Sequence, residues 1–416
     1  MEIKSIPLQI LIIGYVWPEP NSSAAGSRMM QLIESLQSAS FSVHFATPAQ
    51  TTEHMVNLGE MGISTSQIEL NQSSFDDYII SLNPDIVIFD RFMMEEQFAW
   101  RVEKHCPNAL RLLNTEDLHS LRSARHKAVK SGQNFQLSDM HSDLGIREIA
   151  AILRSDLTLM ISEYEYQLLQ DKFNVPAYQL MHLPFMLEKV DQTKLDSLPS
   201  FEERAHFISI GNFRHEPNWD AVLQLKTEIW PKIRKQLPQA QLHVYGAYPP
   251  PKATQLHNEK QGFLIKGWAK DANQVMQNAR VCLAPIRFGA GIKGKLVEAM
   301  QNGTSSITTS IGAEAMHGDF AWNGVISDDM DEFIQSAVSL YQDEPSWKAN
   351  QNKAIQILNH FYHKNEWQQK FIERLIDSKA NQTLNRQQNF MGLMVRHHSL
   401  KSTQYMSQWI EAKNKG

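Results

Sequence analysis

The chain has 416 residues, of which 42% are hydrophobic and 20% are charged, and its formal net charge at pH 7 is -5. This length predicts two or three domains with sizeable cores. No strongly basic region is present, which argues against nucleic acid as the main partner, because such proteins must neutralise many phosphates. The two cysteines, Cys106 and Cys282, lie in or beside apolar runs, so we expect buried thiols and a reducing compartment.

The N-terminal apolar run, residues 8–16, is too short to span a bilayer and lacks a signal-peptide cleavage pattern. We predict that it forms the first strand of a domain. No other run approaches the roughly 18 apolar residues that a membrane span needs. The sequence therefore predicts a cytoplasmic protein, for which peripheral contact with the inner face of a membrane stays open.

Short apolar runs alternate with longer segments in both halves of the chain, a pattern that predicts parallel sheets. The expected strands are residues 8–15, 41–47, 85–90, 110–114 and 157–162, then 206–212, 241–246, 263–268, 281–286, 305–309 and 324–328. The two series share an architecture without a close sequence repeat, which predicts two similar α/β domains that face each other.

The predicted domain organisation follows from these series. We expect an N-terminal domain at 1–183, a linker with two prolines at 184–204, a C-terminal domain at 205–344, and one long helical segment at 345–378. The tail, 379–416, begins with a polar gap and ends in a short amphipathic helix at about 401–413 that includes Tyr405, Met406 and Trp409. We expect this helix to pack on the protein, because its cationic face is weak for a membrane-bound helix.

The segment 281–303 is the most informative part of the sequence. An apolar strand ends in a turn that contains Gly289, Gly291, Lys293 and Lys295, after which helical spacing begins. Glycines let the backbone approach a ligand, a helix N-terminus offers free N–H groups, and the lysines add charge. We predict a phosphate or diphosphate site, with a plain connecting loop and solvated lysines as the alternative.

Other candidate residues follow strands whose carboxyl ends lie at the same edge as this loop. The fork of Arg214 matches a diphosphate. Glu298, about one turn into the helix, can accept two hydroxyls of a ribose, although a solvated glutamate is the alternative. Trp268 could stack on a nucleobase, but a structural tryptophan is favoured.

The N-terminal half carries further candidates at strand ends. Gly26 belongs to the first strand-to-helix turn, which we expect to face a cleft. His119, with Asp117, could orient a substrate hydroxyl, while a helix cap with a nearby histidine is the alternative. The basic run at 122–130 is either a solvated helix face or a contact for an anionic acceptor. For the acidic run at 328–332 we predict helix capping and not a metal site.

These motifs resemble the retaining sugar-nucleotide glycosyltransferases of family 4 type (glycosyl transferases group 1), which have the GT-B arrangement. The resemblance is most specific between residues 207 and 316, through ISIGNFRHEPN, WPKIRKQLPQAQLHVYG, GFLIKGWAKD, ARVCLAPIRFGAGIKGKLVEAM and SIGAEAM. It is weaker in PEPNSSAAGSRM, NTEDLH and RSDLTLMISEYE. The resemblance implies two facing Rossmann-like domains and a C-terminal helix that crosses back, but it leaves the last forty or so residues unexplained.

The resemblance also implies a function. A nucleoside diphosphate-sugar would bind against the C-terminal domain as co-substrate, without a further cofactor or a metal. A glycan, a lipid-linked acceptor or another molecule with a hydroxyl group would enter from the N-terminal domain. The product would be a cell-surface polysaccharide or lipopolysaccharide. Arg214 and Lys293, or Lys295 in its place, would stabilise the departing diphosphate, and Glu298 would hold the ribose. His119 would act on the acceptor side.

Two departures from the family pattern keep alternatives open. The glutamate that usually contacts the sugar is replaced by Ala290, and the lysine expected a few residues after Arg214 is replaced by Trp219 or Asp220. The alternatives are a catalytically silent homologue that acts as a binding partner and a nucleotide-sugar epimerase. A dinucleotide oxidoreductase is disfavoured, because the turn after Gly14 lacks G-x-G-x-x-G.

Overall fold

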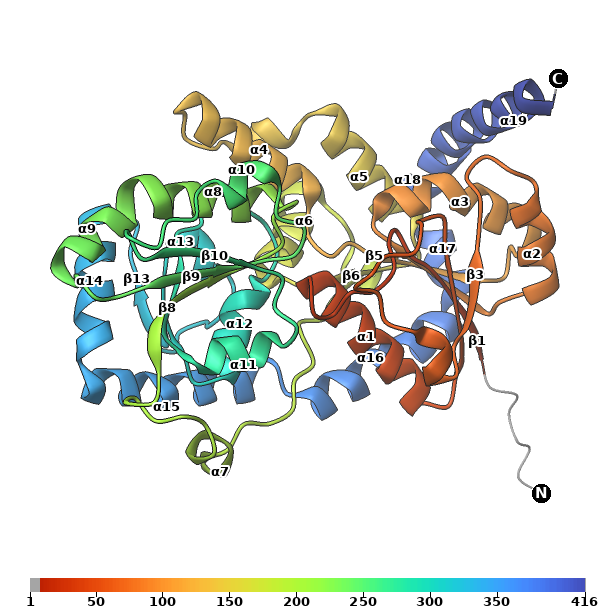
Figure 1. Cartoon of the computed structure of the whole chain (residues 1–416). Coiled ribbons are helices and arrows are strands. Elements are labelled where there is room, and N and C mark those ends of the chain that lie inside the picture. The colour runs from red at the N-terminus through yellow and green to blue at the C-terminus, as the bar shows by residue number, and fades with distance from the viewer. Residues whose placement is uncertain (1–7, 416) are drawn as a thin grey trace.

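The computed structural model describes residues 8–415 and contains two α/β domains that lie side by side (Figure 1). The seven-stranded N-terminal sheet has the order β3-β2-β1-β4-β5-β6-β7, and the six-stranded C-terminal sheet has the order β10-β9-β8-β11-β12-β13. All of these strand pairs are parallel. Each order is doubly wound, with the first strand of the domain inside the sheet. The prediction of two parallel α/β domains is confirmed.

The strands of the N-terminal sheet are β1 (Gln9–Ile13), β2 (Ser42–Thr47), β3 (Ser64–Gln67), β4 (Ile86–Asp90), β5 (Leu110–Asn114), β6 (Leu157–Met160) and β7 (Leu180–His182). Those of the C-terminal sheet are β8 (Ala205–Ile210), β9 (Leu242–Tyr245), β10 (Phe263–Gly267), β11 (Ala279–Ala284), β12 (Ser305–Thr308) and β13 (Gly324–Ile326).

The helices up to the linker are α1 (Ala24–Ser38), α2 (Ser74–Leu82), α3 (Phe92–His105), α4 (His119–Ser131), α5 (Asp143–Arg154), α6 (Glu163–Phe173) and α7 (Gln192–Asp196). Those of the C-terminal domain are α8 (Glu216–Gln224), α9 (Trp230–Gln236), α10 (Pro251–Thr254), α11 (Ala272–Gln277), α12 (Gly294–Gln301), α13 (Ser310–Ala313) and α14 (Met330–Gln342). The last five are α15 (Glu344–Phe361), α16 (Lys364–Ala380), α17 (Gln382–Gln388), α18 (Phe390–Val395) and α19 (Lys401–Lys415).

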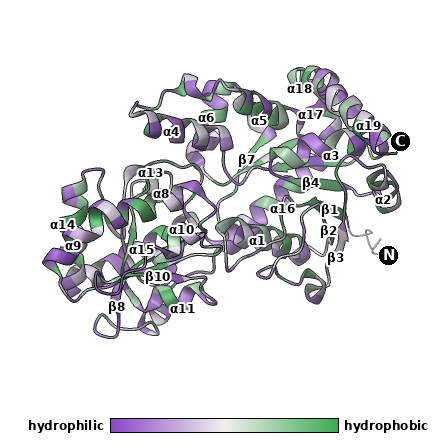
Figure 2. Cartoon of the chain, turned by 45° about the horizontal axis from the view of Figure 1, so that its top comes forward, coloured by the Kyte–Doolittle hydropathy of each residue, from purple (hydrophilic) through white to green (hydrophobic). Residues whose placement is uncertain are grey.

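Most strands inside the two sheets are buried and rich in apolar residues on both faces, and this burial stabilises the sheets. In β1, Ile10 to Ile13 have no exposed surface, and Ile10 pairs with Val43 on one side and Ile86 on the other. Helices cover both faces of each sheet, and in Figure 2 their ribbons alternate between hydrophobic and hydrophilic residues. This arrangement places the strand-to-helix loops of each domain at the carboxyl edge of its sheet.

Two strands were not predicted, and both lie at an edge of the N-terminal sheet. β3 reads STSQ and contains no apolar residue, and its side chains are mostly exposed. β7 has three residues and ends at the start of the predicted linker. Edge strands have one open side, so neither needs the apolar run by which a buried strand is predicted.

The prediction of a single helix at 345–378 is wrong, because α15 ends at Phe361 and α16 begins at Lys364. At the break, the linker residue Leu187 receives a hydrogen bond from the Lys364 N–H and donates one to the Tyr362 carbonyl. α15 packs on the C-terminal domain, whereas Phe371 and Leu375 of α16 belong to the N-terminal core. The chain therefore crosses back as expected, by two helices.

The tail is more ordered than expected. α17 and α18 occupy the predicted polar gap, while the predicted helix at 401–413 is confirmed as α19. Arg386 ties α17 to the N-terminal domain through two hydrogen bonds to Asp156, of 2.7 and 2.6 Å. Among residues 8–415, no helix is both long enough and apolar enough to cross a bilayer.

Candidate functional site

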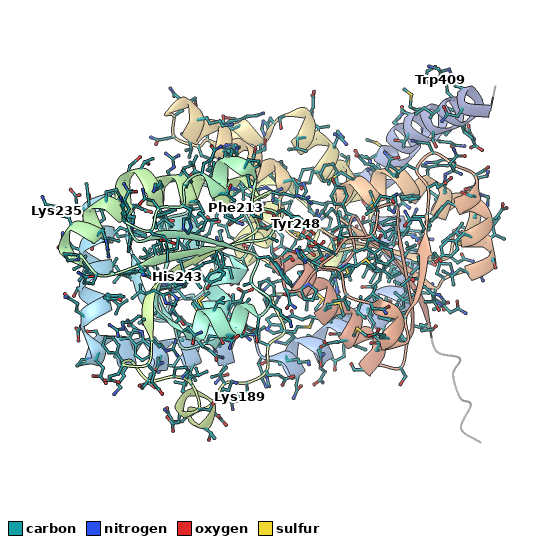
Figure 3. The ribbon with its side chains drawn as sticks, in the orientation of Figure 1. Lys189, Phe213, Lys235, His243, Tyr248 and Trp409 are labelled. Carbon is teal, nitrogen blue, oxygen red and sulfur yellow. The ribbon has the colours of Figure 1, made fainter. Side chains whose placement is uncertain are left out.

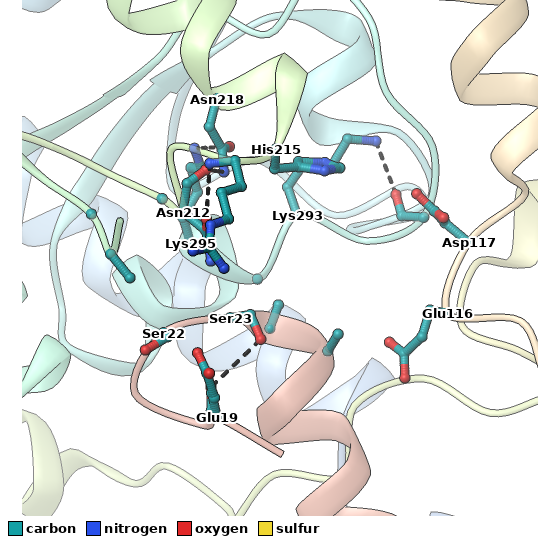
Figure 4. Close-up of a pocket in the computed structure, with 18 of the residues that line it drawn as sticks. Glu19, Ser22, Ser23, Glu116, Asp117, Asn212, His215, Asn218, Lys293 and Lys295 are labelled. Carbon is teal, nitrogen blue, oxygen red and sulfur yellow. Dashed lines mark hydrogen bonds between the residues drawn. The ribbon is translucent and has the colours of Figure 1, made fainter. Parts of the chain in front are cut away.

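A cleft of about 720 Å³ lies between the two domains. It is lined by loops that follow strands of both sheets, among them the loops after β1, β5, β8, β9, β10 and β11. Figure 4 shows Lys293 and Lys295 on the side of the C-terminal domain, with Glu116 and Asp117 opposite them. Ligands of open α/β folds bind at these strand ends, so the cleft is the candidate site.

The glycine-rich loop before α12 is in close contact with the N-terminal domain. Gly291 has a φ of +65°, and a Cβ atom added there would lie 2.9 Å from the Cβ of Asp117. A Cβ atom on Gly294 would lie 2.4 Å from the Cβ of Ala24. Any larger residue at either position would push the domains apart. These two glycines therefore permit the close approach of the two domains, a role that adds to the predicted approach of a ligand. Gly289, in the same loop, also lines the cleft.

Both lysines of the loop point into the cleft. The Lys293 ammonium donates to the Gly291 carbonyl at 2.9 Å, and the Lys295 ammonium donates to Asn218 Oδ1 at 2.7 Å. Burial lowers the pKa of both side chains, that of Lys295 to about 8. Poorly solvated cations gain more from an anionic ligand than cations in water do, because the local dielectric is low.

Arg214 lines the cleft from the same domain as the two lysines. Its guanidinium is exposed and stacks on Tyr248, with 3.7 Å between the guanidinium carbon and the ring centre. The Tyr248 hydroxyl in turn donates to Glu19 Oε1 at 2.7 Å, and Glu19 belongs to the loop after β1. The stack holds the arginine in place at the cleft without occupying its N–H groups.

Glu298 projects into the cleft from α12. Burial raises the pKa of its carboxyl, and the nearby charge of Lys295 offsets part of that effect. Among residues 8–415, no side-chain or backbone donor lies within hydrogen-bond distance of this carboxylate, although Lys295 interacts with it electrostatically. A half-buried acceptor of this kind suits a ligand that brings hydroxyl groups.

Trp268 lines the cleft, but one face of its ring is already covered. The ring stacks on His54 with the centroids 4.1 Å apart, and the indole N–H donates to the Asn21 carbonyl at 3.1 Å. Both partners belong to the N-terminal domain. Trp268 therefore joins the two domains, and its other face is the one that could meet a nucleobase.

The N-terminal side of the cleft carries His119 and two carboxyl groups. His119 Nε2 lies 3.5 Å from Asp117 Oδ1, and Asp117 also pairs with Arg122. Burial lowers the pKa of His119 to about 4, so its ring is neutral at pH 7 and can accept a hydrogen bond. Burial, together with the nearby Asp90, raises the pKa of Glu116 to about 7.

Gly26 does not reach the cleft surface. Its N–H donates to the Ser23 hydroxyl at 3.1 Å, and a Cβ atom added there would lie 2.4 Å from the Glu19 backbone. Gly26 therefore has a packing role in the first turn of α1, directly after the cleft residues Ser22 and Ser23.

Residues 204–343 match the profile of a family described as glycosyl transferases group 1, and no curated protein matches the chain in sequence. Sucrose-phosphate synthase from Thermosynechococcus elongatus has a similar structure, with a TM-score of 0.66 at 15% identity over 90% of this chain and 99% of that one. HepE from Anabaena, in complex with UDP and glucose, gives a TM-score of 0.65 at 12% identity, over 88% of this chain and 99% of the HepE chain.

A mutant of TarM from S. aureus, in complex with fondaparinux, α-GlcNAc-glycerol and UDP, gives a TM-score of 0.55 at 13% identity over 73% of this chain. This chain spans only 58% of that TarM chain. The neighbours are GT-B proteins. The chain has the GT-B fold.

Contacts across the GT-B cleft, which the sequence did not reveal, hold the glycine-rich loop against the N-terminal domain. The Gly291 N–H donates to Glu165 Oε1 at 2.8 Å. Arg125 donates to the Gly289 carbonyl at 2.9 Å and to both carboxylate oxygens of Glu314, at 2.8 and 2.7 Å. Arg125, from the predicted basic run, is thus engaged within the protein and not free for an anionic acceptor.

Glu165 should make the stability of the folded protein depend on pH. Burial, reinforced by the charge of Asp117, raises its pKa to about 8. This pKa is above that of a glutamate in the unfolded chain. Protonated Glu165 therefore makes its whole contribution to the free energy of unfolding below about pH 4.5, and this contribution is lost as the pH rises through 8. We expect the melting temperature of Glu165→Gln to fall less than that of the wild type between pH 6 and 9.

Differential scanning calorimetry at a series of pH values checks this expectation. Glu163→Gln, an exposed glutamate on the same helix, is the matched control and should behave as the wild type does. Glu116 and Glu148, whose pKa values burial raises to about 7, keep part of the pH dependence in every variant. Identical pH profiles for Glu165→Gln and wild type would contradict the assignment.

The acidic run before α14 has the capping role that the sequence predicted. Asp329 accepts a hydrogen bond from the Glu332 N–H at 2.8 Å, and Asp328 accepts one from the Ser310 N–H at 2.9 Å. Within residues 8–415, no three His, Cys, Asp or Glu side chains are grouped so that they could hold a metal ion.

Proposed function

We propose that the chain is a glycosyltransferase that moves a sugar from a nucleoside diphosphate-sugar to an acceptor hydroxyl. The observation that carries this proposal is that Arg214, Lys293, Lys295 and the carboxylate of Glu298 all line the cleft from the C-terminal domain. The glycosyl transferases group 1 profile covers the domain that supplies all four residues. Two structures of the same fold, HepE and TarM, contain UDP, which makes uridine diphosphate the first nucleotide to test.

In this proposal the three cations stabilise the charge that develops on the leaving diphosphate. Such stabilisation is strongest where the donors are already in position and little water surrounds them. The partly buried lysines meet both conditions. Their positive charges would take the place of a divalent metal ion, so transfer should persist in the presence of a chelator. Glu298 would accept the two ribose hydroxyls and so orient the nucleotide.

The acceptor would enter from the N-terminal side, where neutral His119 can orient its hydroxyl. We propose retention: the acceptor oxygen forms its bond to the anomeric carbon on the face from which the diphosphate departs, and its proton passes to the leaving phosphate oxygen. This route needs no side-chain nucleophile. A glycan or lipid-linked acceptor and a role in cell-surface polysaccharide synthesis belong to the same proposal, in the cytoplasm.

A thermal-shift screen against UDP, GDP, dTDP, CMP, NAD and NADP tests the binding step. A ligand that binds only the native state raises the melting temperature. We expect a shift with one nucleoside diphosphate, whereas a shift with NAD or NADP alone would contradict the proposal. Binding without any turnover would favour the silent homologue, and conversion of the donor sugar to its epimer would favour the epimerase.

A further inference from the structure

The last two helices expose apolar side chains and bury polar ones. The apolar residues of α18 and α19 that have 42% to 66% of their surface exposed are Phe390, Met391, Leu393, Met394, Tyr405, Met406 and Trp409, and together they form what we term the apolar face. Towards the protein, the same helical stretch buries Gly392, Arg396 and Ser407. A surface helix of a globular protein normally has the opposite arrangement.

The apolar face is held in a fixed position on the N-terminal domain. A Cβ atom on Gly392 would lie 2.3 Å from the Leu153 carbonyl oxygen, so α18 packs closely on α5. Arg101 of α3 contacts the Ser407 hydroxyl at 3.4 Å and Glu411 at 3.8 Å. Figure 3 shows Trp409 on the side of α19 that is turned away from both domains. The apolar face is therefore part of the folded domain.

The charge around this face is unlike that of the rest of the chain. Residues 382–416 contain five of the 40 Lys and Arg residues but one of the 45 Asp and Glu residues. Arg386 pairs with Asp156 and Arg396 is buried, so the positive charge beside the apolar face comes from lysines. Lys401 is exposed, and the ammonium of Lys413 lies 5.3 Å from the centre of the Trp409 ring. Aromatic and methionine side chains flanked by basic residues suit the interface of a bilayer with anionic headgroups.

We propose that the apolar face docks on the surface of a bilayer that contains anionic lipids. Its apolar side chains would enter the headgroup region, and Lys401 and Lys413 would contact lipid phosphates. A second copy of the chain is disfavoured as the occupant, because a two-fold interface would bring the same basic residues together. This docking does not depend on the proposed enzymatic function.

The test is co-sedimentation of the full chain with vesicles of phosphatidylcholine that contain about one third phosphatidylglycerol. We expect binding that falls at least about tenfold in the double variant Met406→Ser/Trp409→Ser, since both side chains lose their buried apolar area. Lys401→Glu/Lys413→Glu should lose the preference over pure phosphatidylcholine vesicles. Leu223→Ser, an exposed leucine on α8, should bind as the wild type does.

Several results would overturn the proposal. The wild type would fail to sediment with the anionic vesicles, or the wild type and the Met406→Ser/Trp409→Ser variant would bind them equally well. A wild-type dimer that this variant converts to monomer in light scattering would instead assign the face to a second copy. Circular dichroism of each variant shows that the fold is intact, as expected for exposed positions.

Discussion

Replacing Arg214 by alanine is expected to lower turnover by about 10²–10³-fold, the usual cost of removing one group that stabilises transition-state charge. The guanidinium is exposed at the cleft and stacks on Tyr248, so the fold should be unaffected by its removal. The measurement is the steady-state rate of nucleoside diphosphate release from the donor, with the melting temperature as the check on folding.

Arg287→Ala is the matched control. Arg287 is also an exposed arginine of the C-terminal domain, but it pairs with Asp220 and does not line the cleft. Its turnover should stay within about twofold of the wild type, as for most surface changes away from a site. Near-normal turnover in Arg214→Ala would remove this residue from the proposed diphosphate contact.

Replacing Lys293 by alanine is expected to weaken binding of the nucleoside diphosphate by about 10–100-fold, the range for loss of one hydrogen bond between charged groups. In the ligand-free protein its ammonium donates to the Gly291 carbonyl, and burial lowers its pKa. This poorly solvated cation should therefore interact strongly with an anionic ligand in the cleft. Isothermal titration calorimetry with the nucleotide identified in the thermal-shift screen gives the affinity.

Two variants make the result specific. Lys235→Ala, at an exposed position far from the cleft in Figure 3, should bind with wild-type affinity. Lys295→Ala decides which lysine contacts the diphosphate: a larger loss there than in Lys293→Ala would transfer the main role to Lys295. Wild-type affinity in both lysine variants would contradict the phosphate role of the glycine-rich loop.

Much of the fold could be predicted because buried parallel strands leave a clear pattern. Runs such as residues 110–114 match their strands to the residue, since every side chain in them is buried. β3 and the break between α15 and α16 could not be predicted in the same way. β3 is a polar edge strand, and the break is fixed by hydrogen bonds to Leu187, which is more than 170 residues away in sequence.

The candidate site was predicted in part for the same reason. Arg214, Lys293 and Glu298 follow strands or begin helices, so their place at the carboxyl edge of the sheet could be inferred from the sequence, and all three line the cleft. The contacts of Glu165 with Gly291 and of Arg125 with Glu314 join residues that are 126 and 189 positions apart. No local pattern marks such partners, because they depend on how the two domains meet.

The most direct test of the account is to follow an α-linked nucleoside diphosphate-sugar by real-time proton NMR in the presence of the enzyme and a chelator. The donor is the one whose nucleotide gives the thermal shift, and water can serve as a slow acceptor. The account predicts release of the nucleoside diphosphate and appearance of the free sugar first as its α-anomer, at a rate that Arg214→Ala reduces. First appearance of the β-anomer would contradict retention, and an unchanged donor spectrum would contradict the proposed transfer itself.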